Sequence, residues 1–366
     1  MRPTAVESMV PFFSERYANP SGSHRFAREA RRAIDEARDS IAGRLGVAPG
    51  EVIFTGCGTE ADNTVVLGVD GVAVCPAAEH HAVLHPVEEH GGTVVGCDAT
   101  GHVDLDRLAE ALGPEVAVVS VMAVNNEVGT ITDMAAVADV VRRHAPAAVL
   151  HTDAVQAACW LDLRTIAPLV DAMSFSAHKF GGPKGVGVLT VRDGVSLRPL
   201  IAGGGQERER RSGTHNVAGI VATAEALAVT DDERVDEVVR LTVLRDRLVD
   251  GLIGSLDGVV ETVPRAQKVA GSAHVCLEGI ESESLLYLLD EAEVCASAAS
   301  ACASGAMEPS HVLSAMGVDR SLAAGALRLS LGHTTTQADV DRALDVVSSA
   351  VSRLRSSVSP VSVVSS

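Results

Sequence analysis

A lysine follows a short apolar run in the stretch S-F-S-A-H-K-F-G-G-P-K-G-V-G, from Ser174 to Gly187. Most lysines lie at protein surfaces, and this is the simplest explanation of Lys179. A lysine in a cleft at a strand end has another use, because desolvation lowers the pKa of an amine and makes it a nucleophile toward an aldehyde. Lys184 lies in the glycine-rich loop that follows, and we interpret it as structural.

An aspartate stands at the end of the preceding predicted strand, in H-T-D-A-V-Q with Asp153 and Gln156. A buried carboxylate needs a cation or a hydrogen-bond donor, although Asp153 could also simply cap the next helix. Asp153 precedes Lys179 by 26 residues, which is one strand-to-strand step. We therefore expect the carboxylate and the amine at the same edge of a sheet.

Small residues open a predicted helix in T-G-C-G-T-E-A-D-N, from Thr55 to Asn63. The backbone N–H groups of a helix N-terminus and the hydroxyl of Thr59 suit an anion such as phosphate. The alternative is a tight turn in which Thr59 caps the helix, since the stretch matches neither the dinucleotide-binding nor the Walker pattern.

One cofactor accounts for all three features, because pyridoxal phosphate carries an aldehyde, a phosphate and a ring nitrogen. Lys179 would form a Schiff base with the aldehyde, and Asp153 would keep the ring nitrogen protonated. Thr59, Ser176 and His178 would bind the phosphate. These residues predict pyridoxal 5'-phosphate as the cofactor.

A segment of small residues, A-S-A-A-S-A-C-A-S-G from Ala296 to Gly305, contains Cys302. With few large side chains to bury, this segment is predicted to be a mobile loop. An exposed thiol becomes a nucleophile when a base or a cation assists it, and otherwise Cys302 is incidental. Cys295 follows a predicted strand end and is expected to be a buried core thiol.

Composition and charge exclude several classes of protein. The seven cysteines are an odd number without a C-x-x-C pair, so we expect neither a disulfide framework nor a metal site. The net charge of -18 and the lack of a long basic run argue against a nucleic-acid partner. The longest apolar run, Val116 to Val124, is half the length of a membrane span, and no apolar leader opens the chain. We therefore expect a cytoplasmic protein without a membrane partner.

Strands and helices must alternate to bring the candidate residues together. Short apolar runs are separated by segments with helical spacing, such as Asp133 to His144, and this order is typical of an α/β fold with a mostly parallel sheet. Ligands of such sheets bind at the carboxyl ends of strands. The predicted strands are residues 51–55, 71–75, 93–97, 116–122, 147–152, 171–176 and 185–191.

The chain of 366 residues is long enough for a large and a smaller domain. Helices are expected at Arg25–Leu45, before the sheet, and at Val235–Leu252, before a second group of strands and helices that starts near Val259. We expect a large cofactor-binding domain over residues 15–250 and a small domain over residues 1–14 and 251–355 that carries Cys302. Residues 356–366 are predicted to be a disordered tail.

In order and spacing, these motifs resemble those of the cysteine desulfurases in the class V aminotransferase group. The resemblance runs from about Asn19 to Thr335. It rests on N-P-S-G-S-H-R-F, F-T-G-C-G-T-E-A-D-N, E-H-H-A-V-L, N-N-E-V-G, H-T-D-A-V-Q, S-F-S-A-H-K-F-G-G-P-K-G, R-S-G-T, S-A-C-A-S-G and L-R-L-S-L-G. It implies the aspartate aminotransferase-like fold of pyridoxal phosphate enzymes (fold type I), with a large domain and a smaller C-terminal α+β domain. The segment around Cys302 resembles the subgroup with an extended catalytic loop.

The resemblance implies roles for individual residues. His80 would stack on the cofactor ring and handle protons, and Arg328 would pair with the substrate carboxylate near Asn126. Thr214 would reach the phosphate from a partner subunit, which implies a homodimer. The implied cofactor-binding set is Gly58, Thr59, His80, Asn126, Asp153, Gln156, Ser176, His178, Lys179 and Thr214. Considered alone, His80 could be an ordinary core or surface histidine, Asn126 a turn residue and Arg328 a member of a strand-end ion pair.

The implied reaction converts L-cysteine to L-alanine. The thiolate of Cys302 would attack the substrate sulfur and keep it as a persulfide for an acceptor protein, such as an iron–sulfur scaffold or a thiolation carrier. A selenocysteine lyase and a non-catalytic scaffold in sulfur trafficking are the two alternatives.

The sequence departs from the family pattern at three places. His333 stands where the family usually has arginine, and Ala298 and Ala299 replace a usual Ser-Gly. In the family, a strand and an Ala-Thr-Thr-Pro turn that helps to finish the substrate pocket precede the region that matches Arg2 to Met9.

Overall fold

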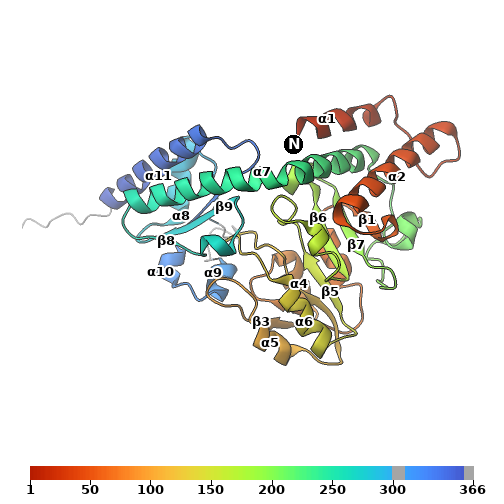
Figure 1. The fold of residues 1–366 in the computed structure, drawn as a ribbon, viewed down its shortest axis with the longest axis horizontal. Helices are drawn as coiled ribbons and strands as arrows, with labels where there is room; N and C mark the ends of the chain where they lie inside the picture. Colours follow the sequence, from red (N-terminus) through yellow and green to blue (C-terminus); the bar gives the residue numbers. More distant parts are fainter. Residues whose placement is uncertain (299–309, 358–366) are drawn as a thin grey trace, which may run out of the picture. The chain divides into compact units, whose positions relative to one another are not determined.

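The computed structural model describes residues 1–298 and 310–357 (Figure 1). Their contacts divide the chain into two compact units. The large unit comprises Met1–Gly96, Val103–Asn125 and Thr132–Val235. The small unit comprises Cys97–His102, Asn126–Ile131 and the described residues from Asp236 onward.

A seven-stranded sheet forms the centre of the large unit, in the order β1-β7-β6-β5-β4-β2-β3. All strands run in one direction except β7, which pairs antiparallel with both β1 and β6. Its strands are β1 (Val52–Thr55), β2 (Val72–Pro76), β3 (Thr93–Val95), β4 (Val116–Ser120), β5 (Val149–Asp153), β6 (Ala172–Ser176) and β7 (Gly187–Val191). Most of these runs are rich in β-branched residues and nearly all are fully buried, as expected for a sheet covered on both faces. The predicted mostly parallel sheet is confirmed.

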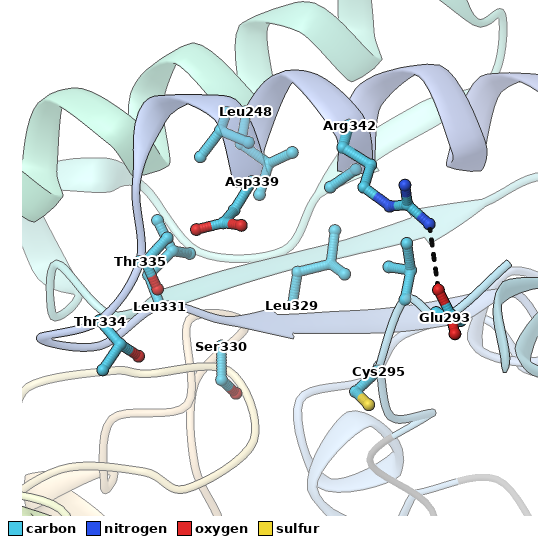
Figure 2. A pocket seen from close by; sticks show the side chains of 13 residues that line it. Leu248, Glu293, Cys295, Leu329, Ser330, Leu331, Thr334, Thr335, Asp339 and Arg342 are labelled. Atoms are coloured by element: carbon cyan, nitrogen blue, oxygen red, sulfur yellow. Dashed lines mark ion pairs between the residues drawn. The ribbon is translucent and has the colours of Figure 1, made fainter.

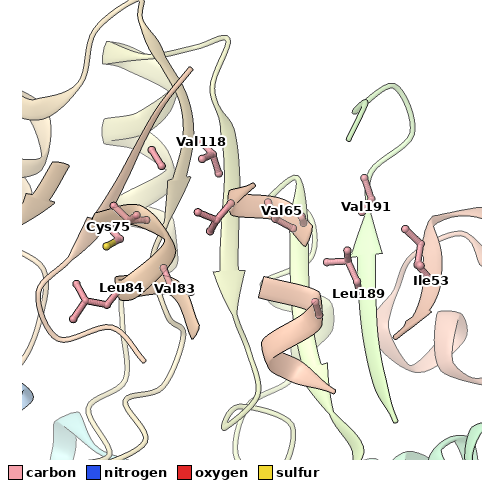
Figure 3. Close-up of a cluster of buried hydrophobic side chains, with 13 residues drawn as sticks. Ile53, Val65, Cys75, Val83, Leu84, Val118, Leu189 and Val191 are labelled. Carbon is pink, nitrogen blue, oxygen red and sulfur yellow. The ribbon is translucent and has the colours of Figure 1, made fainter. Parts of the chain in front are cut away.

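Helices bury their apolar stripes against this sheet. Val65 of α3 and Val83 of α4 share one core with Ile53, Val118 and Leu189 from three strands (Figure 3). The helices of the large unit are α1 (Pro3–Met9), α2 (Arg25–Leu45), α3 (Gly58–Val66), α4 (His81–Glu89), α5 (Leu105–Ala111) and α6 (Met134–His144), with the short 3-10 turns η1 (Val10–Phe13), η2 (Pro49–Glu51), η3 (Leu163–Thr165), η4 (Ala177–Phe180) and η5 (Gln206–Glu209).

The predicted helix Arg25–Leu45 is confirmed as α2. The ring of His24 caps its start by accepting a hydrogen bond from the backbone N–H of Ala27. Ile34, Ile41 and Leu45 recur at helical spacing and are buried.

A separate antiparallel sheet of three strands, in the order β10-β9-β8, organises the small unit. Helices α8 and α11 pack against each other in this unit. Its elements are β8 (Val259–Glu261), η6 (Arg265–Gln267), β9 (Ser272–Leu277), α8 (Ser282–Glu291), α9 (His311–Ala315), α10 (Arg320–Ala323), β10 (Ala326–Ser330) and α11 (Gln337–Ser357). The second group of strands and helices expected from Val259 is present.

The long helix α7 spans Val217–Ser255, whereas the sequence pattern predicted only Val235–Leu252. Its first half is apolar and alanine-rich on several faces, and Ile220, Ala222 and Ala226 are buried. A helix that is apolar around its circumference has no amphipathic period, so the pattern missed this half.

The unit boundaries also differ from the expected ones. Residues 1–14 belong to the large unit, and the division falls at Val235 and Asp236, inside α7, rather than at residue 250. An unbroken helix carries no linker signal, which is why the sequence did not locate this boundary. At the other end, α11 continues to Ser357, so the first two residues of the expected tail are helical. The remainder of that tail, residues 358–366, lies outside the described residues.

Within residues 1–298 and 310–357, no helix combines the length and the apolar character needed to cross a membrane.

Candidate active site

The carboxyl ends of β5 and β6 place Asp153 and Lys179 at one edge of the large sheet. Asp153 is the last residue of β5 and pairs in register with Ser174 of β6. Lys179 follows β6 directly, in the one-turn helix η4. The Lys179 side chain is exposed, and its charge acts on the carboxyl group of Asp153. The structure thus brings the two residues together at the edge where the sequence expected them.

Asp153 is 5% exposed, and its Oδ1 accepts a 2.8 Å hydrogen bond from the backbone N–H of Val155. Burial raises the pKa of Asp153 to about 6, although the Val155 N–H and the charge of Lys179 act in the opposite direction. A protonated ring nitrogen beside this carboxyl would lower its pKa again, because an opposite charge favours the ionised form. Asp153 therefore fits the predicted contact with a pyridine nitrogen.

Two further carboxyl groups, those of Asp62 and Glu79, are buried within electrostatic reach of Asp153. They are 1% and 0% exposed. Burial and the charge of Asp153 raise the pKa of both groups well above the usual range. Glu79 Oε1 accepts a 2.5 Å hydrogen bond from the backbone N–H of Met122. Three buried carboxyl groups that act on one another favour a cationic ligand in this part of the large unit.

A chain of buried polar side chains crosses the strands beside this acidic cluster. His151 Nδ1 lies 2.8 Å from Ser120 Oγ, and His151 Nε2 lies 2.8 Å from Ser174 Oγ. Asp62 Oδ1 is 3.7 Å from His151 Nε2. Burial lowers the pKa of His151 to about 3, so its ring is neutral at physiological pH. The sequence analysis missed this chain and both added carboxyl groups; polar residues inside otherwise apolar strands were the only available signal.

The start of α3 meets the end of β6, where the phosphate was predicted to bind. A methyl group built on Gly58 would lie 2.7 Å from Val155 Cγ2 and 3.3 Å from Ser176 Cβ, so only glycine permits this close approach. Ser176 Oγ lies 2.9 Å from His178 Nδ1. Burial, followed by the charges of Lys179 and Lys184, lowers the pKa of His178. Thr59 is exposed in the first turn of α3, whose N–H groups suit an anion.

His80 is an exposed residue that caps the start of α4. Its Nδ1 accepts a 3.1 Å hydrogen bond from the backbone N–H of Ala82. The proton of the neutral ring therefore lies on Nε2, which is the atom that can exchange it with a ligand. Gln156 is half-buried in the turn after β5.

The loop that carries Thr214 begins in a left-handed turn. Glu207, Arg208 and Glu209 have φ values of 49°, 57° and 66°, a conformation that costs non-glycine residues about 1 kcal/mol or more each. The Glu207 carboxylate fixes this turn. It accepts hydrogen bonds of 2.8 and 2.7 Å from Arg38 and of 3.0 Å from the backbone N–H of Phe54. The sequence analysis did not foresee this buried anchor.

A second ion pair joins the same loop to the phosphate-binding helix. Arg211 donates hydrogen bonds of 2.8 and 3.2 Å to the two carboxylate oxygens of Glu60 in α3. Thr214 follows three residues later and is exposed.

In the small unit, Arg328 of β10 and Asn126 lie together. Arg328 Nη1 donates a 2.7 Å hydrogen bond to the backbone carbonyl of Asn126. Among the described residues, Arg328 Nε and Asn126 Oδ1 are buried without a hydrogen-bond partner. A guanidinium with an unused donor is suited to a carboxylate, which agrees with the predicted substrate role.

Both flanks of the predicted catalytic segment attach to this part of the small unit. Ser297 pairs with Arg328 through backbone hydrogen bonds of 3.1 and 2.7 Å. On the other side, the Ser310 hydroxyl donates a short hydrogen bond to Glu127, the neighbour of Asn126. Cys302 itself lies outside the described residues, as do residues 299–309 as a whole.

A pocket of about 430 Å³ lies elsewhere in the small unit, and Arg342 pairs with Glu293 across 3.8 Å at its rim (Figure 2). Cys295 lines this pocket and is exposed, so the expectation of a buried core thiol was wrong. The short turn after α8 does not continue into a packed strand, and the thiol therefore remains at the surface. None of the predicted cofactor-binding residues lines this pocket. His333 is exposed, and its backbone carbonyl accepts a hydrogen bond from Arg240.

Comparison with known proteins agrees with this arrangement. The family model described as aminotransferase class-V matches residues 1–343. The chain is 44% identical to an IscS-like cysteine desulfurase of Mycobacterium tuberculosis, over 97% of this chain and 94% of that protein. It is 41% identical to a cysteine desulfurase of Gluconacetobacter diazotrophicus, over 96% and 91% of the two chains.

Solved structures give the same result. A NifS-like protein, 35% identical in sequence, superposes with a TM-score of 0.89 over 96% of both chains. The predicted fold type I architecture is confirmed. By sequence and by structure, the chain belongs to the cysteine desulfurase family of class V aminotransferases.

Proposed function

We propose that this chain is a pyridoxal phosphate-dependent cysteine desulfurase that converts L-cysteine to L-alanine and holds the released sulfur as a persulfide on Cys302. The observation that carries the proposal is the buried Asp153 carboxyl beside Lys179 at the carboxyl edge of the sheet. No structural role in the large unit calls for a carboxylate with a raised pKa at this place, whereas a ring nitrogen would stabilise its charge.

Pyridoxal phosphate supplies an aldehyde for the substrate amine and a ring that withdraws electrons from the substrate α-carbon. Asp153 holds a proton at the ring nitrogen and so maintains this withdrawal. Lys179 Nζ anchors the cofactor, and the Nε2 atom of His80 exchanges protons with the substrate. Gly58, Thr59, Ser176 and His178 bind the phosphate around the start of α3.

The substrate carboxylate binds Arg328, and Asn126 lies beside it. The net reaction balances without an external oxidant or reductant. A bond forms between the sulfur of Cys302 and the substrate sulfur, and the substrate carbon–sulfur bond breaks. The carbon receives a proton and leaves as L-alanine, while Cys302 keeps the transferred sulfur as a persulfide.

We further propose a cytoplasmic homodimer in which Thr214 binds the phosphate of the other copy. The exposed position of Thr214, at the end of a loop anchored by Glu207 and Arg211, supports this role. A thiol on an acceptor protein, in iron–sulfur cluster or thio-cofactor assembly, then removes the sulfur from Cys302.

The test measures L-alanine and protein persulfide from L-cysteine, with and without added pyridoxal phosphate. Lys179→Ala should lose the visible absorbance of the bound cofactor and both products, while Lys184→Ala, in the same loop, should keep them. Cys302→Ser should bind the cofactor but form no persulfide, and Cys295→Ser is its matched control. Sulfur transfer that survives Cys302→Ser would refute the assignment of the nucleophile. Faster turnover of L-selenocysteine than of L-cysteine would favour a selenocysteine lyase, and no turnover of either would favour a scaffold.

A further inference from the structure

Three consecutive backbone carbonyls, those of Lys179, Phe180 and Gly181, accept hydrogen bonds from three distant parts of the large unit. Cys159 Sγ lies 3.5 Å from the Lys179 carbonyl. Thr230 Oγ1 donates to the Phe180 carbonyl at 2.9 Å. The backbone N–H of Arg2 donates to the Gly181 carbonyl at 2.8 Å. The segment that carries the lysine is therefore held from outside.

Arg2 and Thr230 also bond to each other and form one connected clamp. Arg2 Nε donates to Thr230 Oγ1 at 3.1 Å, so this hydroxyl accepts one hydrogen bond and donates another. Arg2 Nη1 donates to Glu233 at 2.6 Å. Figure 1 shows the N-terminus beside α7, the helix that carries Thr230 and Glu233. Both members of the clamp are buried, Arg2 at 8% and Thr230 at 3% exposure.

The clamp also packs tightly against the turn that follows Lys179. Gly181 has a φ of 88°, and a methyl group built on it would lie 2.7 Å from Arg2 Cγ. The backbone N–H groups of Gly181 and Gly182 both bond to the carbonyl of Ala177 and close the turn. A four-residue 3-10 turn has weak hydrogen-bond geometry of its own, so outside contacts decide how firmly it is held.

Firm support of the backbone matters because the Lys179 side chain is exposed. The position of a long flexible side chain depends on where its backbone is fixed, and an amine that must bond an aldehyde has to lie at a defined place. We propose that Arg2 and Thr230 are positioning residues that fix the Lys179 backbone for its reaction with the cofactor. This inference rests on the proposed function and assigns the N-terminal helix α1 a part in it.

A clamp that only stabilises the fold would have a different signature. Thr223 provides the matched control, because it is a buried threonine of the same helix, at 0% exposure. Its hydroxyl donates to the carbonyl of Gly219 at 2.7 Å, within α7, and not to the lysine segment. Thr230→Val and Thr223→Val therefore remove the same group from equally buried sites, and only the first opens the clamp.

The first measurement is hydrogen–deuterium exchange in the protein without cofactor. The amides of Gly181 and Gly182 should exchange about tenfold faster in Thr230→Val than in wild type, since their turn loses its support. Thr223→Val should leave these two amides unchanged. Equal exchange in the two variants would overturn the proposal.

The second measurement is the rate at which added pyridoxal phosphate becomes attached to Lys179, followed by borohydride trapping and mass spectrometry. Misplacement by about 1 Å costs up to a hundredfold in rate, so we expect a loss of tenfold to a hundredfold in Thr230→Val. Thr230→Ser should restore the rate because it restores the hydroxyl. A loss in Thr223→Val of the same size would show a general effect of folding and overturn the proposal.

Glu233→Gln serves as the milder variant if Thr230→Val does not fold, because the Glu233 side chain is 49% exposed. It weakens the hold on Arg2 and should raise amide exchange severalfold; unchanged exchange at Gly181 and Gly182 would overturn the clamp. If wild type attaches no cofactor, the proposed function fails. The exchange comparison then still decides whether the clamp holds the lysine segment.

Discussion

Replacement of Glu207 by glutamine tests the anchor of the left-handed turn. Burial alone would raise the pKa of Glu207, but hydrogen bonds from His215 and Arg38 lower it to about 2 from an ordinary value of 4.5. The difference of about 2.5 pKa units corresponds to about 3 kcal/mol of folding free energy at 1.36 kcal/mol per unit. Breaking a buried ion pair typically costs 3–5 kcal/mol, which agrees with this magnitude.

The pH dependence has a definite sign. Folding depresses the pKa of Glu207, so its contribution is complete above about pH 4.5 and is lost as the pH falls toward 2. The gap in unfolding free energy between wild type and Glu207→Gln should therefore shrink from about 3 kcal/mol at pH 7 to about 1.5 kcal/mol at pH 3.

Urea unfolding followed by the fluorescence of the single tryptophan measures this gap, because Trp160 lies in the large unit together with the turn. Glu209→Gln is the matched control, since Glu209 has the same left-handed backbone but is exposed. It should change the unfolding free energy by less than about 0.5 kcal/mol. Equal unfolding free energies of the two variants at pH 7 would refute the reasoning.

Two further predictions concern the cofactor site. Lys179→Ala removes a charge that lowers the pKa of Asp153, so carboxyl ¹³C NMR of the cofactor-free protein should show that pKa above 6, whereas Lys184→Ala should leave it near 6; an unchanged value in Lys179→Ala would place the amine away from Asp153. Gly58→Ala pushes a methyl group against Val155 and Ser176, so a loss of about 1–3 kcal/mol in stability and a cofactor Kd raised about tenfold are expected in thermal and fluorescence titrations. Gly43→Ala, where no atom lies within 4 Å, is the control, and the same cofactor Kd in both variants would contradict the close approach at Gly58.

Periodicity and strand-end position predicted much of the molecule from sequence. The strand order of apolar runs located the sheet, and the step between Asp153 and Lys179 placed both at one edge, since parallel strands end on the same side. These features depend on local pattern and chain direction alone. The family resemblance added the residues of the small unit, Asn126 and Arg328, which no periodicity connects.

Other features depend on partners that are far away in sequence. Asp62 and Glu79 look like ordinary helix and turn residues until the fold buries both near Asp153. The bond between Arg2 and Thr230 joins residues 228 positions apart, and no local rule connects them. The first half of α7 is apolar on several faces, which hides its helical period.

The pairing of Ser297 with Arg328 limits how far the proposed sulfur carrier can travel. Cys302 is four residues beyond Ala298, and an extended chain spans at most about 3.6 Å per residue, so its Cα stays within about 14 Å of the Cα of Ala298 whatever path the chain takes. The eight residues back to Ser310 would permit about 29 Å, so the shorter tether sets the radius. A recipient of the sulfur must therefore bring its own thiol inside that radius, beside the end of β10, because the donor cannot come out to meet it at a distance.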